Sequence, residues 1–413
     1  MYIEGAKCIS CGKEWQLSDI SYQCPTCQGN LDIVYNYKTL RNNYPKTRFS
    51  QQSKPYSIWR YLPFLPLKKT PKLPLQVGWT PLYPAPNEYG IKLFIKDEGR
   101  NPSGSLKDRA TAVVLGSALE TGIAHMAAAS TGNAGASLAC LSAGMGIPTT
   151  VFVPEKAPKA KIAQLCIFGT RVFSVTGSYD DAYDLCKRAS NVLGWYNRNT
   201  GYNPLTREGK KTCAYEICEQ LNWQPPDWVI VSVGNGNILS GLWKGFKDLY
   251  AIGYIEHLPK MAGVQSFASN AIALSVRHAK SNKSIDIASV QASTIADSIA
   301  VNTPRDGVFA VKAILESGGT VIEVTDTQIL MAIKTVAQRW GVFGEPAGVA
   351  CMAGLEKLWE EGTLRLGERV VCVITGNGLK DVTSALKVSH DMVTKIAPDA
   401  LDESDWKDGS FPF

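Results

Sequence analysis

The sequence predicts an α/β fold with mainly parallel sheets that are covered by helices on both faces. Short apolar runs typical of buried strands, such as "KLFIKDEG", "WVIVSVG" and "RVVCVITG", alternate with helix-length segments such as "NAGASLACLSAGMG". At 413 residues the chain is too long for one simple core, so more than one domain is expected. Apolar residues make up 45% and charged residues 19% of the chain, which is an ordinary balance for a globular protein.

The first 36 residues carry two Cys-x-x-Cys motifs, "CISC" and "CPTC", separated by 12 residues. Four thiolates at this spacing can bind one tetrahedral Zn²⁺, and so short a segment has too little core to fold without a metal. We therefore predict a structural zinc ribbon with the ligands Cys8, Cys11, Cys24 and Cys27. The alternative is a ribbon that does not retain its metal. No basic cluster flanks the motifs, so nucleic-acid binding is not expected.

The remaining seven cysteines are scattered through apolar segments. We predict that they are small core residues of a protein in a reducing compartment. The start "MYIEGAKC" lacks the layout of a signal peptide, and no apolar run approaches the length of a membrane span. The formal net charge of +6 is spread over the chain without a long basic run. We expect a cytoplasmic protein that binds neither membranes nor nucleic acids.

After the ribbon, residues 37–78 are rich in proline, lysine and aromatic residues, with little periodicity. We predict an extended arm that lies over a neighbouring domain or subunit. From Thr80 onward, strand and helix patterns alternate. In sheets of this kind ligands bind beyond the carboxyl ends of the strands, where loops meet helix N-termini.

Lys107 stands where such a loop becomes a helix, in "NPSGSLKDRATAV". Turn-forming residues precede it, and helical spacing of apolar residues continues to Gly122. The positive end of the helix dipole disfavours the ammonium form, and a readily deprotonated lysine is what an imine to an aldehyde cofactor requires. The alternative is an ordinary charged residue near a helix cap.

The loop "ASTGNAGAS" also lies between a strand and a helix. Its amides and hydroxyls form an anion site suited to a substrate carboxylate, made by Ser130, Thr131, Gly132 and Asn133. A plain helix cap has a similar sequence.

Two more loops follow predicted strands. In "VSVGNGNILSGLWKGF" the amides of Gly234, Asn235, Gly236, Asn237 and Ile238 can surround a phosphate at a helix start, although a purely structural glycine turn is the alternative. The loop lacks the nucleotide-binding patterns, so its phosphate should belong to a molecule smaller than a dinucleotide. In "VCVITGNGLKD" the neutral hydroxyl of Thr375 can contact a ring nitrogen without protonating it. Together with the lysine and the carboxylate loop, these features fit pyridoxal 5'-phosphate.

Several motifs in the same order resemble the tryptophan-synthase-β group of pyridoxal-phosphate enzymes (fold type II), and within it the threonine synthases. They include "IKDEGRNPSGSLKDR", "ASTGNAGAS", "NPLTREGKKT", "GNGNILSGLWKGF", "TIADSIA", "GVFGEPAGVACMAGL" and "ITGNGLKD". The likeness covers close to 300 residues, and the four-cysteine segment resembles that of several archaeal-type members.

This resemblance implies a role for each motif. Lys107 would hold the cofactor aldehyde as an imine and act as general base, and Asn133 would contact the phenolic oxygen of the cofactor. Residues 234–238 would bind its phosphate and Thr375 its pyridine nitrogen, while Glu345 would line the site.

The activity implied is that of a carbon–oxygen lyase that converts O-phospho-L-homoserine and water to L-threonine and phosphate by γ-elimination and β-addition. A homodimer is expected. The alternatives are β-replacement on phosphoserine, as in cysteate synthase, serine or threonine dehydration, and a non-catalytic ligand sensor. Two departures from the family pattern bear on the substrate. The loop "GNGN" is one residue shorter than the usual Gly-Asn-x-Gly-Asn, and Ala300 replaces an arginine of many relatives, near the acidic Asp297.

The motifs also suggest how the chain is divided. We expect a zinc ribbon over residues 1–36, an extended arm over 37–78, a large pyridoxal-phosphate domain over 79–105 and 206–397, a small inserted α/β domain over 106–205, and an acidic, poorly ordered tail over 398–413.

Overall fold

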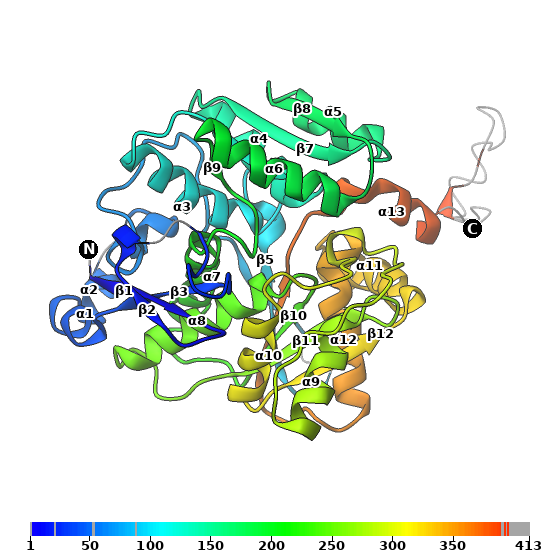
Figure 1. Cartoon of the computed structure of the whole chain (residues 1–413). Coiled ribbons are helices and arrows are strands. Elements are labelled where there is room, and N and C mark those ends of the chain that lie inside the picture. Colours follow the sequence, from blue (N-terminus) through cyan, green and yellow to red (C-terminus); the bar gives the residue numbers. More distant parts are fainter. Residues whose placement is uncertain are drawn as a thin grey trace, which may run out of the picture.

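A six-stranded sheet forms the centre of the larger part of the molecule in the computed structural model, which describes residues 2–19, 22–51, 54–86, 89–389, 392–393 and 395 (Figure 1). The predicted tail over 398–413 lies outside the described residues. Across the sheet the strands are β12 (Thr320–Val324), β11 (Lys260–Ser266), β10 (Trp228–Ser232), β13 (Arg369–Ile374), β5 (Lys92–Asp97) and β4 (Leu82–Pro84). All neighbouring pairs are parallel except β4 with β5, which closes one edge.

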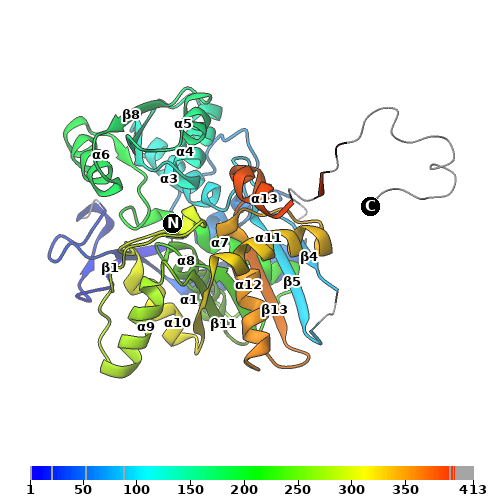
Figure 2. The same ribbon diagram turned by 90° about the vertical axis from the view of Figure 1, so that its right-hand side faces the viewer.

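Helices cover both faces of this sheet because its strands are apolar on both sides. Val229 and Val231 of β10 belong to the core beneath α7 (Leu205–Gln220), α8 (Asn237–Ala251) and α10 (Gly307–Glu316). The alternate residue Ile230 belongs to the opposite core, with α11 (Asp326–Trp340) and α12 (Pro346–Glu360). Figure 2 shows α12 beside β13, and α11 packs against α12. Helix α9 (Ala271–Asn282) packs on α10 and β12.

A smaller, fully parallel sheet lies above the first in Figure 1. Its order is β8 (Arg171–Val175), β7 (Thr149–Pro154), β6 (Met126–Ala129) and β9 (Tyr196–Asn197). The helices α3 (Lys107–Glu120), α4 (Asn133–Gly144) and α5 (Lys159–Cys166) pack on one face, and α6 (Tyr179–Leu193) packs on the other. The predicted class, α/β with mainly parallel sheets, is confirmed.

The N-terminal ribbon is a three-stranded antiparallel sheet of β2 (Glu14–Trp15), β1 (Ile3–Cys8) and β3 (Leu31–Tyr35). Its inward side chains share a core with α7 and α8 rather than forming one of their own. Lys244 of α8 fixes this contact, since its ammonium donates to the Ile33 carbonyl and to Asp32 Oδ1, both at 2.6 Å. The ribbon is therefore part of the body that carries the large sheet.

The segment predicted as an extended arm contains the short helices α1 (Tyr37–Asn43), α2 (Thr47–Gln51) and η2 (Ile58–Phe64). Phe49 and Phe64 enter the core of the large sheet, whereas Leu65 and Leu67 enter the core of the small one. The arm is thus anchored to both parts of its own chain. The small sheet lies within residues 126–197 and the strands of the large sheet within 82–97 and 228–374, while the boundaries proposed above remain predictions. Helix α13 (Val382–Ser389) ends the described helices, and none of these is long and apolar enough to cross a membrane.

Candidate active site

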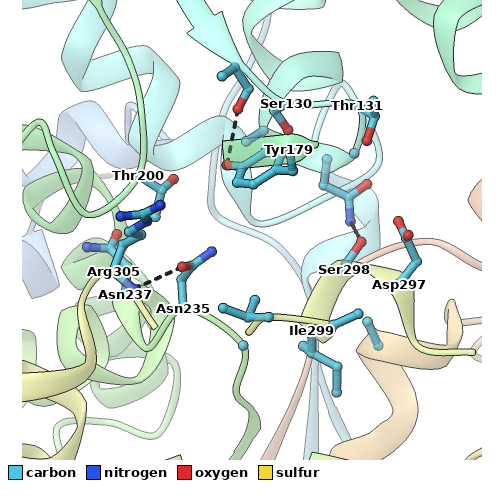
Figure 3. Close-up of a pocket in the computed structure, with 18 of the residues that line it drawn as sticks. Ser130, Thr131, Tyr179, Thr200, Asn235, Asn237, Asp297, Ser298, Ile299 and Arg305 are labelled. Carbon is cyan, nitrogen blue, oxygen red and sulfur yellow. Dashed lines mark hydrogen bonds between the residues drawn. The ribbon is translucent and has the colours of Figure 1, made fainter. Parts of the chain in front are cut away.

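A cavity of about 450 Å³ opens between the two sheets, at the carboxyl ends of β6, β9, β10 and β13. Its lining includes Lys107, residues 130–133, residues 234–238 and Thr375. The structure thus brings every residue predicted for the cofactor and for the substrate carboxylate into one pocket. Figure 3 shows Ser130 and Thr131 on one side, with Asn235 and Asn237 on another.

Lys107 is the first residue of α3, and the two residues after it anchor the start of this helix. Asp108 accepts hydrogen bonds from the Ser103 hydroxyl (2.6 Å) and amide (2.7 Å), which fixes the preceding loop. Arg109, fully buried, forms ion pairs with Glu98 (2.7 Å) and Glu216 (2.6 Å). Breaking such a buried pair costs about 3–5 kcal/mol, so the position of the Lys107 backbone is strongly constrained.

The amine of Lys107 loses its proton far more readily than that of an ordinary lysine. Burial lowers the pKa of Lys107 to about 8; Glu345 opposes this shift, while Arg198 and Lys380 add to it. Desolvation penalises the ammonium form, as does the helix N-terminus at which this residue sits. A lysine with these properties can act as a nucleophile and as a base.

The loop 130–133 joins β6 to α4 and offers backbone donors to the cavity. Among the described residues, the amides of Thr131 and Gly132 have no protein acceptor. Asn133 is oriented by its side-chain amide, which donates to Glu345 Oε1 at 2.5 Å and to Ser298 Oγ at 3.3 Å. Glu345 is buried, and burial raises the pKa of its carboxyl. By accepting this hydrogen bond, Glu345 holds the side chain of Asn133 in place.

The loop 234–238 joins β10 to α8 and is shaped by its glycines. Gly236 has φ +90°, and a Cβ on it would lie 2.7 Å from Ala310 Cβ. A Cβ on Gly234 would lie 2.9 Å from Ile299 Cα. In the part of the chain that the structure describes, the amides of Gly234, Asn235 and Gly236 have no acceptor. Unpaired amides at a helix N-terminus form an anion site.

Thr375 follows β13 and is 5% exposed. Its backbone carbonyl accepts a hydrogen bond from the amide of Leu106 at 3.0 Å. This bond ties the hydroxyl-bearing residue to the start of α3, directly before Lys107. The backbones of Thr375 and Lys107 are therefore held close to each other.

The four cysteines of the ribbon precede all the residues that line the cavity in the sequence, and they lie close to one another in space. Their sulfur atoms all lie within 4.8 Å, with 3.4 Å between Cys8 and Cys27 and 3.7 Å between Cys11 and Cys24. Four sulfurs about 2.3 Å from one tetrahedral zinc are about 3.8 Å apart. The cluster therefore has the dimensions of a structural zinc site.

Comparison with known proteins decides the family. A family model described as "Pyridoxal-phosphate dependent enzyme" matches residues 73–376. The threonine synthase of Methanocaldococcus jannaschii is 42% identical over 393 residues, which cover 94% of this chain and 95% of that protein. The threonine synthase of Methanosarcina acetivorans is 37% identical over 390 residues, covering 93% and 94%.

The chain belongs to the threonine synthase family. Solved structures share its fold. The threonine deaminase isoform 2 of Solanum lycopersicum has a TM-score of 0.63 at 21% identity, covering 75% of this chain and 82% of that one. Maize serine racemase has a TM-score of 0.62 at 21% identity, covering 76% and 92%. The expected fold type II is confirmed, and at this identity the likeness concerns the fold alone.

The pocket of this threonine synthase family member fits pyridoxal phosphate. A readily deprotonated lysine is available for the aldehyde, the unpaired amides of Gly234, Asn235 and Gly236 for the phosphate, and a buried hydroxyl for the ring. Shortening the loop to "GNGN" does not remove these amides. Ala300 and Asp297 both line the cavity, and Asp297 is paired with Lys161.

The sequence did not single out several residues of the pocket, among them a tyrosine and two buried cations. Tyr179 lines the cavity and donates its hydroxyl hydrogen bond to the Ala129 carbonyl at 3.3 Å (Figure 3). Arg198 and Lys210 line it as well. Lys210 lies inside the motif "NPLTREGKKT", and Arg198 follows the short strand β9. The sequence showed only that each of these two cations stands in or next to a family motif. It did not indicate which residue each side chain would contact.

Proposed function

We propose that this chain converts O-phospho-L-homoserine and water to L-threonine and phosphate by γ-elimination and β-addition. One observation carries the proposal. A readily deprotonated lysine, two sets of free backbone amides and a neutral hydroxyl line one cavity in a chain 42% identical to a curated threonine synthase. This combination suits an amino-acid substrate and a phosphorylated aldehyde cofactor.

In this proposal pyridoxal phosphate is held by the chain at four points. Lys107 binds its aldehyde, Asn133 its phenolic oxygen, residues 234–238 its phosphate and Thr375 its ring nitrogen. When bound, the cofactor supplies an electron sink for negative charge at the α-carbon of the substrate. The neutral Thr375 hydroxyl moderates this sink, which favours elimination and replacement over transamination.

The other roles belong to side chains and amides of the protein. The amides and hydroxyls of residues 130–133 hold the substrate carboxylate and so orient the α-carbon. Lys107 Nζ takes the proton from that carbon, because a base with a pKa near the working pH is most effective. Glu345 keeps Asn133 in position through their 2.5 Å hydrogen bond.

A phosphate-release assay tests the proposal. The purified protein should release phosphate from O-phospho-L-homoserine with formation of L-threonine, and only weakly from O-phospho-L-serine. Lys107→Ala should abolish turnover and leave residual, non-covalent cofactor binding. A higher rate with O-phospho-L-serine or unphosphorylated serine, or a fully active Lys107→Ala variant, would contradict it.

We further propose that Cys8, Cys11, Cys24 and Cys27 bind one structural Zn²⁺. Four thiolates close the coordination shell and leave no position for substrate. The sulfur separations of 3.4 Å and 3.7 Å support this assignment.

The remaining expectations are also proposals. The domain division at residues 36, 78, 105, 205 and 397 is supported by the separate sheets, and a homodimer in the cytoplasm is proposed. The buried free cysteines support a reducing compartment. Size-exclusion chromatography with light scattering tests the oligomeric state.

A further inference from the structure

Two buried cations of the pocket have no carboxylate partner among the described residues. Arg198 donates to Thr111 Oγ1 (3.1 Å), to Thr200 Oγ1 (2.8 Å) and to the Lys107 carbonyl (3.4 Å), all of which are neutral acceptors. Lys210 also donates to a neutral acceptor, the side-chain oxygen of Asn237. Both cations line the cavity and are 0% exposed.

The neighbours of Lys210 on α7 show how unusual this is. Arg207 forms an ion pair with Asp306 at 2.7 Å, and Lys211 forms one with Glu208 at 2.7 Å. Lys210 instead donates to Asn237 Oδ1, at the first residue of α8. A buried charge without a counter-charge is costly, so its presence calls for a ligand that supplies one.

The electrostatics of the pocket point the same way. Burial lowers the pKa of Lys210 well below its ordinary value, Lys107, Arg198 and Arg207 lower it further, and Asp306 opposes them. Burial likewise lowers the pKa of Arg198 to about 10. The cations of this pocket repel one another until an anion lies between them.

The anions already assigned do not use these two side chains. The cofactor phosphate is assigned to the loop amides at 234–238, and the substrate carboxylate to those at 130–133. Arg198 lies beside the carboxylate loop, since the next residue, Asn199, accepts from the Ala129 amide at 2.7 Å. Lys210 touches the start of α8. The two cations therefore flank the space between the two loops.

We propose that Arg198 and Lys210 form the subsite for the phosphate group of the substrate. This inference rests on the proposed function and deepens it, because it makes the phosphate, rather than the amino-acid part alone, the feature that the pocket selects. Ala300 brings no charge to its side of the cavity, and these two cations approach it from the end of β9 and from α7.

The test uses the holoenzyme with Lys210→Gln, since glutamine can still donate to Asn237 but carries no charge. We expect the KM for O-phospho-L-homoserine and the inhibition constant for inorganic phosphate to rise about 10- to 100-fold, as for loss of a charged hydrogen bond. The affinity for L-threonine, followed by the absorbance change of the cofactor, should stay within about twofold. Lys247→Gln is the matched control, because Lys247 lies exposed on α8, paired with Glu316 and outside the cavity.

Calorimetry gives a readout independent of turnover. Inorganic phosphate binding to the wild-type holoenzyme should take up protons, seen as a heat that depends on the ionisation enthalpy of the buffer, because the anion raises the pKa of Lys210. This proton uptake should be lost in Lys210→Gln. Lys210→Met, which removes the donor altogether, is the second variant if the first does not fold.

Two results would overturn the inference. The first is a Lys210→Gln protein that loses cofactor on dialysis but has an unchanged KM at saturating cofactor, because Lys210 would then serve the cofactor phosphate. The second is an equal weakening of phosphate and L-threonine binding. If the wild-type protein does not consume O-phospho-L-homoserine but binds phosphate and O-phospho-L-serine in a Lys210-dependent manner, the subsite stands and the proposed substrate falls.

Discussion

Asn30 of the N-terminal ribbon donates a hydrogen bond to Asp306 Oδ1 at 3.0 Å, across 276 positions of sequence. Asp306 is 1% exposed and also holds the loop proposed for the cofactor phosphate. Its Oδ2 accepts from the Asn237 side chain at 2.9 Å, and its amide donates to the Asn235 carbonyl at 2.9 Å. The ribbon therefore contacts the carboxylate that fixes the shape of the pocket at residues 234–238.

This contact predicts that Asn30→Ala weakens cofactor retention. Removing the amide leaves Asp306 Oδ1 with fewer donors and loosens its hold on Asn237. We expect the dissociation constant of pyridoxal phosphate to rise about 5- to 20-fold, as for the loss of a hydrogen bond to a charged group. Cofactor absorbance during stepwise dialysis measures it. Asn43→Ala is the control, since Asn43 contacts Tyr2 at 3.4 Å, away from the cavity. Equal retention in the two variants would count against the coupling.

Metal removal should act through the same contact. We expect metal analysis of protein purified without chelator to find one zinc per chain, and Cys11→Ser to lower that content. A strong chelator should first disorder the ribbon. Cys8 and Cys24 lie in the core that the ribbon shares with α7 and α8, and removal of the metal breaks the link between their sulfur atoms. Cofactor loss should follow more slowly. Cofactor release that precedes zinc release would refute this order.

The local patterns of the sequence were sufficient for much of the pocket. Lys107, residues 130–133, residues 234–238 and Thr375 each stand at a strand end or helix start, where local turn chemistry is informative. Parallel sheets bring the carboxyl ends of their strands to one edge. The sequence alone was therefore enough to predict that these residues lie close together.

Tertiary pairing could not be predicted in the same way. Arg207, Lys210 and Lys211 lie within five residues, and nothing in "TREGKKT" separates them. Their partners come from different places: Asp306 for Arg207, Asn237 for Lys210, and both Glu208 of α7 and Asp248 of α8 for Lys211. The helices within the predicted arm were missed for a related reason. Their aromatic residues are held by packing on two cores rather than by helical periodicity.

The lowered pKa of Lys107 predicts how the cofactor-free protein takes up pyridoxal phosphate. Burial lowers this pKa from its ordinary value of 10.5 to about 8, so the reactive neutral amine is a minor form at pH 7 and the major form at pH 9. The rate of covalent uptake should therefore rise about 10-fold between these pH values, with a midpoint near 8, and then level off. Stopped-flow absorbance measures the rate, and a rise that continues unchanged to pH 10.5 would contradict the assignment.

Glu345→Gln sharpens this test because it changes one neighbour of the amine. The charge of Glu345 raises the pKa of Lys107, whereas burial, Arg198 and Lys380 lower it. Removing that negative charge should move the midpoint of cofactor uptake below 8. Glutamine retains a carbonyl that can accept from Asn133, so the pocket should keep its shape. An upward shift of the midpoint would show that Glu345 does not act on the amine through its charge.

Thr375 offers the sharpest test of how the pocket controls the reaction. Its backbone carbonyl accepts a hydrogen bond from the Leu106 amide at 3.0 Å. Substitutions of the side chain leave this hydrogen bond in place. Thr375→Ser keeps a neutral hydroxyl and should keep most activity. Thr375→Val keeps the shape but leaves the ring nitrogen without its partner, and it should lose about 10-fold in kcat.

Thr375→Asp introduces a carboxylate at the same position, which favours a protonated cofactor ring. Protonation strengthens the electron sink but spreads negative charge into the ring, where a proton added at the cofactor's own carbon starts transamination. We expect this variant to lose about 100-fold or more of its turnover, as for a misplaced catalytic group. It should also convert gradually to the amine form of the cofactor during incubation with substrate, which absorbance spectra record. Because a buried carboxylate also destabilises the fold, thermal melts of the Asp and Val variants separate the two effects. Wild-type turnover in Thr375→Asp without a side reaction would show that another group contacts the ring nitrogen.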